Sequence, residues 1–286
     1  EIDAVIDSRR LLSNELLEIT HWMADYYLCP WGQVLDSVIP AGVRSGAGTR
    51  MATLLSVPEA IAAARSEQKL PPKQAAVLDY VLAHPGSTPA EVAAAVGCTQ
   101  APVTTLRRKG LLESESRRLA VEADPEAVVP QEAHLEMNPD QANALEKIME
   151  SLQTGKHETI LIHGVTGSGK TEVYLQAIRE VVSYGRQAIV LVPEISLTPQ
   201  TVSRFRSRFG RVAVLHSHLS DVERHRQWAR IAAGGAPVVV GARSAIFAPT
   251  PNLGLIVIDE EHESSFKQDS APRYHARDVA ERRAAA

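Results

Sequence analysis

A phosphate-binding pattern occurs in the stretch GVTGSGKT, Gly164 to Thr171, which matches G-x-x-x-x-G-K-[ST]. The stretch lies between an apolar run, TILIH, and a helical pattern, EVYLQAIREVV, as such a loop requires. Its glycines allow backbone N–H groups to face a phosphate, Lys170 reaches the β- and γ-phosphates, and Thr171 supplies an oxygen to Mg²⁺. The residues predicted to bind the nucleotide at this loop are Gly164, Gly167, Ser168, Gly169, Lys170 and Thr171.

A carboxylate pair follows a second apolar run, LGLIVI, in the tetrad DEEH of residues 259–262. Hydrolysis of a nucleoside triphosphate needs one carboxylate on the metal side and a second group that orients the attacking water. Asp259 followed by Glu260 supplies both. We therefore predict that Lys170, Asp259 and Glu260 are catalytic and that Thr171 and Asp259 hold Mg²⁺. The alternative is an acidic loop after an edge strand, but a phosphate loop in the same predicted sheet favours an ATPase.

The elements that must position these motifs alternate along the chain from Asn138 onward. Apolar runs predict strands in TILIHG, QAIVLVPE, VAVLHS, PVVVGA and LGLIVIDE, and helical patterns lie near 172–184, 198–209 and 220–233. Val- and Ile-rich strands that alternate with helices predict a parallel sheet covered on both faces. Ligands of such sheets bind at the carboxyl ends of the strands, where both motifs fall. The fold class predicted for residues 126–286 is therefore α/β.

The Ala-rich zone of residues 50–125 has the outline of a winged helix. The stretch STPAEVAAAVGCTQAPVTTLRRKG predicts a helix, a turn at Gly97, a second helix and an exit at Gly110 into a short strand pair. Pro102 inside the second helix argues against recognition of DNA bases by this helix in the major groove. Contact with DNA and docking of a protein both remain open for the basic end of this helix, which carries Arg107, Arg108 and Lys109.

Residues 1–49 begin with a further amphipathic helical pattern, and Ser13 is its predicted N-cap. The apolar residues at helical spacing are Leu12, Leu16, Ile19, Met23 and Tyr26.

The composition limits the class of protein. A chain of 286 residues with 44% hydrophobic and 22% charged residues has the material for about two soluble domains. No run approaches the roughly 18 apolar residues of a membrane span, so we expect no membrane partner. The two cysteines, Cys29 and Cys98, cannot form a four-thiolate zinc site and indicate reduced cytosolic thiols. The net charge of -4 argues against a uniformly basic nucleic-acid surface but not against local basic patches.

The Asp-Glu-x-His tetrad resembles motif II of the superfamily 2 helicases and translocases, whose lobes have a RecA-like P-loop fold. Upstream of the loop, MNPDQANAL places Gln141 where the resemblance implies contact with the adenine of ATP. LVPEISLTPQ resembles motif Ia and VVVGARSAIFAP resembles motif Ib, both of which imply contacts with single-stranded DNA. The alternative is that these are ordinary polar loop residues. The implied DNA contacts are Ser196, Thr198, Gln200, Arg243 and Ser244.

A narrower resemblance covers the whole chain. The segments VTGSGKTEVY, LVPEISLT, GARSAIFAP, IVIDEEHESSFKQDSAPRYHARD and MADYYLCPWGQVL are similar to those of the bacterial primosomal replication-restart helicases, a DEAH-type family. This resemblance implies a 3′-to-5′ DNA helicase that uses ATP and Mg²⁺ at stalled or abandoned replication forks. Its implied partners are branched and single-stranded DNA, single-strand-binding protein and primosome proteins, and its implied location is the cytoplasm at the nucleoid.

The same resemblance assigns the segments of the chain. Residues 1–49 would be the end of a 3′-DNA-binding domain and a linker, 50–125 the winged helix, and 126–286 the first helicase lobe. Zinc occurs in the family, but its ligands have no counterpart in this chain. We therefore expect a fragment that ends after the first lobe, binds Mg-ATP weakly on its own and does not unwind DNA.

The segment behind the tetrad resembles the aromatic-rich loop of the family. There Phe266, Arg273 and Tyr274 would stack on bases or hold phosphates, since stacking on an aromatic ring contributes roughly 1–3 kcal/mol per base. His262 would couple the nucleotide to the DNA. The alternatives are a core position for Phe266 and a structural hydrogen bond for His262.

Two other functions fit parts of the pattern. A double-stranded DNA translocase would share the phosphate loop and the tetrad without separating strands, and the aromatic-rich loop speaks against it. An ATP-switched winged-helix regulator would bind a specific duplex through residues 90–112.

Overall fold

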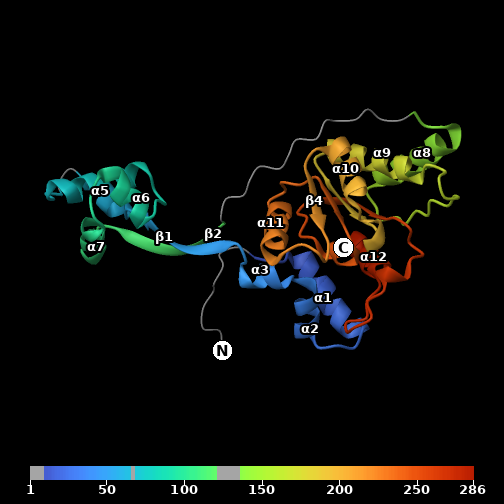
Figure 1. The fold of residues 1–286 in the computed structure, drawn as a ribbon, viewed down its shortest axis with the longest axis horizontal. Coiled ribbons are helices and arrows are strands. Elements are labelled where there is room, and N and C mark those ends of the chain that lie inside the picture. The colour runs from blue at the N-terminus through green and yellow to red at the C-terminus, as the bar shows by residue number, and fades with distance from the viewer. Residues whose placement is uncertain (1–9, 66–67, 121–135) are drawn as a thin grey trace. The chain divides into compact units, whose positions relative to one another are not determined.

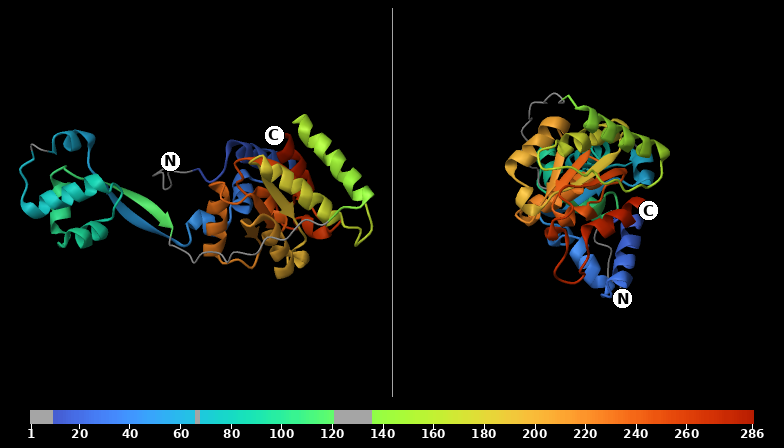
Figure 2. Two further views of the ribbon diagram at one scale, coloured as in Figure 1. Left: turned by 90° about the horizontal axis from the view of Figure 1, so that it is seen from above. Right: turned by 90° about the vertical axis from the view of Figure 1, so that its right-hand side faces the viewer.

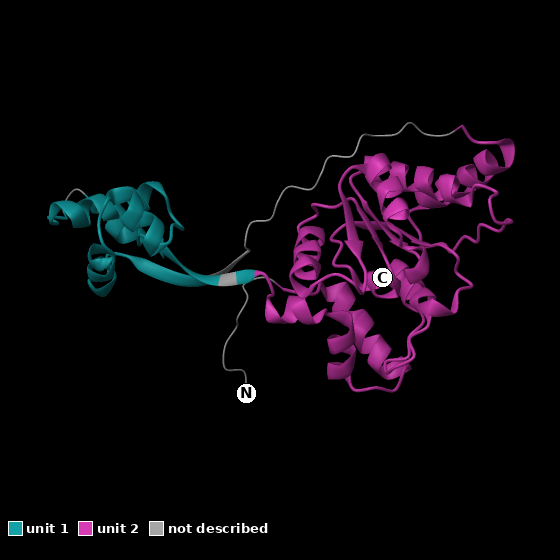
Figure 3. Cartoon of the chain, viewed as in Figure 1, with its two compact units in different colours: residues 1–8, 49–122 teal, residues 9–48, 123–286 magenta. Residues whose placement is uncertain are grey.

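The computed structural model describes residues 10–65, 68–120 and 136–286. It divides the chain into two compact units, which Figure 3 colours separately. One unit is formed by residues 1–8 and 49–122 and the other by residues 9–48 and 123–286. Within the described residues, no helix has the length and apolar character that a bilayer crossing requires.

The larger unit is built on a parallel sheet of four strands (Figure 1). The strands lie in the order β4-β5-β3-β6, and β3 is central because it pairs with β5 on one side and with β6 on the other. Four of the five predicted strands are therefore confirmed, and their bounds are β3 Gln187–Leu191, β4 Val212–Leu215, β5 Val238–Gly241 and β6 Leu253–Ile258.

Helices cover both faces of this sheet, as the end-on view in Figure 2 shows. On one face, α9 (Lys170–Ser183) and α10 (Pro199–Phe209) pack on alternate strand residues such as Val190, and α8 (Pro139–Thr154) packs on α9. On the other face, α11 (Asp221–Ala232) and α12 (Ala276–Ala285) pack with residues such as Ile189. The predicted α/β class is confirmed, because alternating side chains of one strand are buried on both sides.

The N-terminal helices α1 (Asn14–Tyr26), α2 (Trp31–Val38) and α3 (Ala41–Ser45) belong to the same unit. Leu16, Ile19 and Met23 of α1 are buried in one apolar cluster with the sheet, whereas Tyr26 is 62% exposed. Ser13 caps α1, as predicted, and its hydroxyl accepts a hydrogen bond from the Leu16 N–H at 3.3 Å.

The prediction of a strand in TILIHG is wrong. Residues 157–163 form no strand, and Leu161 is 78% exposed. An apolar run forms a strand only if a neighbouring edge accepts its backbone hydrogen bonds. Here a cavity lined by residues of this segment and of β6 separates the two, so no ladder forms between them.

The smaller unit has the helices and the paired strands of a winged helix. Its strands β1 and β2 pair in antiparallel register from Thr49↔Ala120 to Ser56↔Glu113. The predicted strand pair is thus formed by a strand before the helices and a strand after Gly110. Pro102 lies in the first turn of α7, where proline is tolerated, so it does not interrupt that helix and gives no argument against groove reading. The elements are β1 Thr49–Ser56, α4 Glu59–Ala63, α5 Pro72–Ala83, α6 Pro89–Val96, α7 Ala101–Arg108 and β2 Glu113–Ala120.

Short 3₁₀ helices complete the larger unit at the ends of strands. They are η2 Glu194–Ser196, η3 Arg243–Phe247 and η4 Ser264–Phe266.

Candidate active site

The phosphate loop closes around the side chain of Lys170, the first residue of α9. Its ammonium donates hydrogen bonds to the carbonyl oxygens of Gly164 at 2.6 Å and Val165 at 2.9 Å. Gly167 and Gly169 have left-handed φ values of 81° and 82°, which favour glycine. The loop therefore holds a cation among backbone groups at the N-terminus of a helix, an arrangement that suits a phosphate.

Gln141 lies directly against this loop. Its side-chain amide donates to the Ser168 carbonyl oxygen at 2.9 Å, and its side-chain oxygen accepts from the Asn138 N–H at 2.9 Å. A Cβ atom on Gly169 would lie 2.1 Å from the Gln141 amide nitrogen, so only glycine permits this approach. The structure thus joins Gln141 to the phosphate loop, and its contact with adenine stays a prediction.

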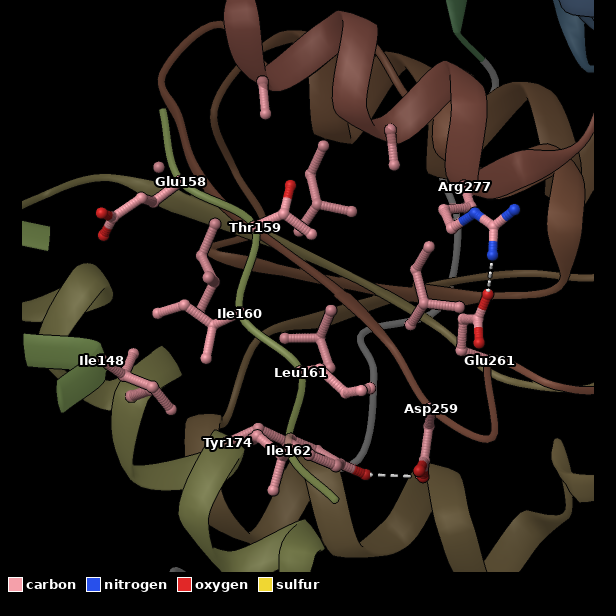
Figure 4. A pocket seen from close by; sticks show the side chains of 18 of the residues that line it. Ile148, Glu158, Thr159, Ile160, Leu161, Ile162, Tyr174, Asp259, Glu261 and Arg277 are labelled. Atoms are coloured by element: carbon pink, nitrogen blue, oxygen red, sulfur yellow. Dashed lines mark hydrogen bonds and ion pairs between the residues drawn. The ribbon is translucent and has the colours of Figure 1, made fainter. Parts of the chain in front are cut away.

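The carboxylate of Asp259 is oriented by two hydrogen bonds at the end of β6. One oxygen accepts from the Glu260 N–H at 3.1 Å, and the other accepts from the Tyr174 hydroxyl at 2.9 Å (Figure 4). The Asp259 N–H donates to the Leu191 carbonyl oxygen at 2.9 Å, which ties the tetrad to β3. Asp259 is therefore held by both the sheet and the helix of the phosphate loop.

Glu260 adopts a left-handed backbone with φ 51° and has an exposed side chain. A non-glycine residue in this region costs energy, and such residues cluster at functional sites. The catalytic role of Glu260 stays a prediction.

Tyr174 is the site residue that the sequence reasoning missed. It is 6% exposed, and burial followed by the Asp259 charge raises the pKa of its phenol well above the usual range. The Thr171 side chain and the charge of Arg204 act in the opposite direction on that pKa. Position 174 is one helical turn after Thr171, and this i, i+3 spacing is the signal that could have identified it.

A cavity of about 1940 Å³ opens beside these residues. The segment of residues 158–162 crosses one side of it, and Asp259 and Glu261 border the other (Figure 4). The exposed side chain of His262 also lines this space, and its coupling role stays a prediction. Glu261 forms an ion pair with Arg277 rather than with the phosphate loop.

The oxygen donors brought together here fit Mg²⁺. Tyr174 donates to Asp259 and lies one helical turn after Thr171, so the carboxylate predicted to hold the metal is joined to the helix that carries the predicted hydroxyl ligand. Mg²⁺ prefers such hard oxygen ligands and takes only one or two from the protein in nucleotide sites. A cluster of three or more His, Cys, Asp or Glu side chains suited to a metal does not occur in the described part of the chain.

The predicted DNA contacts of motif Ia lie at the start of α10. Thr198 is the N-cap of this helix and accepts from the Thr201 N–H at 3.2 Å, while Ser196 is half-buried and Gln200 is exposed. The Thr198 hydroxyl therefore has a structural role in this conformation. The contacts with DNA stay predictions.

Arg243 of motif Ib holds the aromatic-rich loop. Its guanidinium donates to the carbonyl oxygens of Ser265 at 3.0 Å and of Lys267, and it lies 5.9 Å from the centre of the Tyr274 ring. Ser244 beside it is exposed. Motif Ib and the aromatic-rich loop, each predicted to contact DNA, are therefore in contact with each other through Arg243.

The two aromatic residues of this loop are core residues in the structure. Phe266 is 1% exposed and Tyr274 is 2% exposed, so neither ring presents a face for stacking on a base. Only Arg273 of the three predicted contacts is exposed. The alternative of a core position holds for Phe266, and stacking would require the loop to open.

Helices α1 and α2 contact the same loop. The Tyr27 hydroxyl donates to the Asp278 carboxylate at 3.2 Å and accepts from the His275 N–H at 3.4 Å. The Lys267 ammonium lies 5.6 Å from the centre of the Tyr27 ring. Burial raises the pKa of Tyr27 to about 12. This contact could not be predicted from the sequence, because residues 27 and 278 are far apart in the chain.

Comparison with protein families gives two matches. A family model described as DEAD/DEAH box helicase matches residues 138–283, which are 146 of the 286 residues. A second, described as 3′DNA-binding domain, matches residues 1–40.

Curated relatives with the name "Replication restart protein PriA" are similar over much of the chain. The protein of Bacillus subtilis is 47% identical over 74% of this chain and 27% of its own length. That of Chlamydia pneumoniae is 39% identical over 96% of this chain and 38% of its own length, and that of Haemophilus influenzae is 39% identical over 91% and 36%. The chain thus spans less than two fifths of the length of each of these relatives.

Proposed function

The chain belongs to the DEAD/DEAH box helicase family, and from this premise we propose that it carries the first RecA-like lobe of an ATP-dependent 3′-to-5′ DNA helicase that acts in replication restart. The observation that carries the proposal is the 2.9 Å hydrogen bond between Tyr174 and Asp259. It brings the helix of the phosphate loop and the acidic tetrad to one place, which ATP hydrolysis requires.

Each site residue has a distinct part in this proposal. Lys170 neutralises charge on the β- and γ-phosphates of ATP, and Gln141 contacts the adenine. Glu260 orients the attacking water from the end of β6. Thr171 and Asp259 would hold Mg²⁺, which would supply positive charge to stabilise the phosphates.

DNA recognition in this proposal is supported by the match of residues 1–40 to a 3′DNA-binding domain. The contacts of Tyr27 with Lys267, His275 and Asp278 join that segment to the loop behind the tetrad. Branched and single-stranded DNA are the proposed substrates. The name shared by the relatives supports a role in replication restart. Single-strand-binding protein and primosome proteins are the partners, and the nucleoid the location, that this proposal includes.

A second candidate is a double-stranded DNA translocase that does not separate strands. The burial of Phe266 and Tyr274 favours it, because the structure offers no exposed aromatic platform in this loop for unstacked bases. Both candidates share the same ATP site.

The test uses the native protein with Lys170→Ala. ATP hydrolysis stimulated by forked DNA and displacement of a strand from the fork should both be lost, while binding to the fork should persist. Strand displacement by the wild type supports the helicase. Displacement of a third strand from a triplex without fork unwinding supports the translocase instead. Full hydrolysis by Lys170→Ala would overturn both candidates.

A further inference from the structure

A single phenol joins the helix of the phosphate loop to the carboxylate that would hold the metal. The Tyr174 hydroxyl donates to the Asp259 carboxylate at 2.9 Å, and Tyr174 lies one helical turn after Thr171 in α9. We propose that Tyr174 is a positioning residue that orients the Asp259 carboxylate toward Mg²⁺ bound with a nucleotide. This inference rests on the proposed ATP site and adds a residue to it.

The chemistry of the two groups sets the direction of this hydrogen bond. An ionised carboxylate only accepts, so the single phenol hydrogen points at Asp259. The bond therefore fixes one carboxylate oxygen of Asp259.

The tyrosine can perform this role because its ring is fixed. Tyr174 is 6% exposed and belongs to the apolar cluster that contains Val190 of β3 and Phe205 of α10. The second oxygen of Asp259 is bound by the Glu260 N–H at 3.1 Å, so the carboxylate is oriented from both sides. Partners that orient metal ligands in this way commonly change metal affinity by about 10- to 100-fold when they are removed.

Tyr174→Phe tests the inference because it removes the hydroxyl and keeps the ring. The measurement is binding of a fluorescent ATP analogue to this chain while Mg²⁺ is titrated, with binding of Mn²⁺ followed by electron paramagnetic resonance as a direct readout of the metal. We expect the variant to need about tenfold more Mg²⁺ for half-maximal binding. Its affinity for the nucleotide without metal should stay near that of the wild type.

The matched control is Tyr184→Phe, which removes an exposed hydroxyl at the C-terminal end of the same helix. Its Mg²⁺ requirement should equal that of the wild type. An unchanged Mg²⁺ requirement in a folded Tyr174→Phe would overturn the inference, and so would an equal loss of nucleotide affinity with and without metal. Failure of the wild type to bind the nucleotide would contradict the proposed function instead.

A second measurement on the wild type does not depend on how well the variant folds. Addition of Mg²⁺ to the nucleotide-loaded chain should change the ultraviolet absorption of Tyr174. The reason is that Asp259, which accepts the hydrogen bond of its hydroxyl, would then bind the metal. Absence of any tyrosine signal would also count against the inference.

Discussion

The guanidinium of Arg208 binds the carboxylate of Glu172 through two nitrogen atoms, at 3.3 and 3.2 Å. Glu172 directly follows Thr171 of the phosphate loop, and Arg208 lies in the last turn of α10, the helix that Thr198 caps. The two side chains are 10% and 5% exposed. The predicted nucleotide segment and the helix behind motif Ia are therefore joined by a buried ion pair.

Breaking this pair should destabilise the larger unit. Arg208→Met leaves the Glu172 carboxylate buried without its cation, so we expect the free energy of unfolding to fall by about 3–5 kcal/mol. Chemical denaturation measures the change. The double variant with Glu172→Met should recover much of the loss, because no buried charge then remains. Arg211→Met, at an exposed position just after the helix, is the control and should change stability little. A loss as large in the control would refute the assignment.

Removal of the Tyr27 hydroxyl should loosen the aromatic-rich loop. Tyr27→Phe deletes the hydrogen bonds to Asp278 and His275, which contribute about 1 kcal/mol each. Hydrogen exchange of the amides in residues 266–278 should become faster. Tyr26→Phe, at the neighbouring exposed tyrosine, should leave the exchange unchanged. Equal protection in both variants would show that α1 does not hold the loop.

The buried and exposed residues of the loop should respond differently to truncation. Phe266→Ala removes a side chain that is 1% exposed, so we expect a loss of about 3–5 kcal/mol of stability. Arg273→Ala should leave stability nearly unchanged and weaken binding of single-stranded DNA, with a smaller salt dependence. Thermal unfolding and titration of DNA at two salt concentrations separate the effects. A stable Phe266→Ala with impaired DNA binding would restore the stacking role.

Much of the sheet could be predicted from the sequence because the apolar runs of β3, β4 and β5 are buried on both faces. The position of Asp259 at the end of β6 followed from the rule that ligands bind at the carboxyl ends of parallel strands. The run in TILIHG was misread, since an apolar pattern does not reveal whether a neighbouring strand edge lies within hydrogen-bonding reach.

The missed residues depend on packing between distant segments. The bond from Tyr174 to Asp259 exists only because α9 packs on the sheet next to the end of β6. Likewise, an aromatic residue among basic ones fits a DNA-facing loop and a loop anchored in the core equally well. The burial of Phe266 and Tyr274 therefore had to come from the structure.

The most direct test of the proposed ATP site compares two adjacent glutamates in the native protein. Glu260→Gln removes the group proposed to orient water, whereas Glu261→Gln breaks an ion pair with Arg277 whose side chains are 36% and 50% exposed. The measurement is the rate of ATP hydrolysis with single-stranded DNA at saturating ATP. The hydrolysis rate of Glu260→Gln should fall about a hundredfold or more while the variant still binds ATP. The rate of Glu261→Gln should stay near that of the wild type. Hydrolysis that survives Glu260→Gln, or an equal loss in Glu261→Gln, would contradict the account.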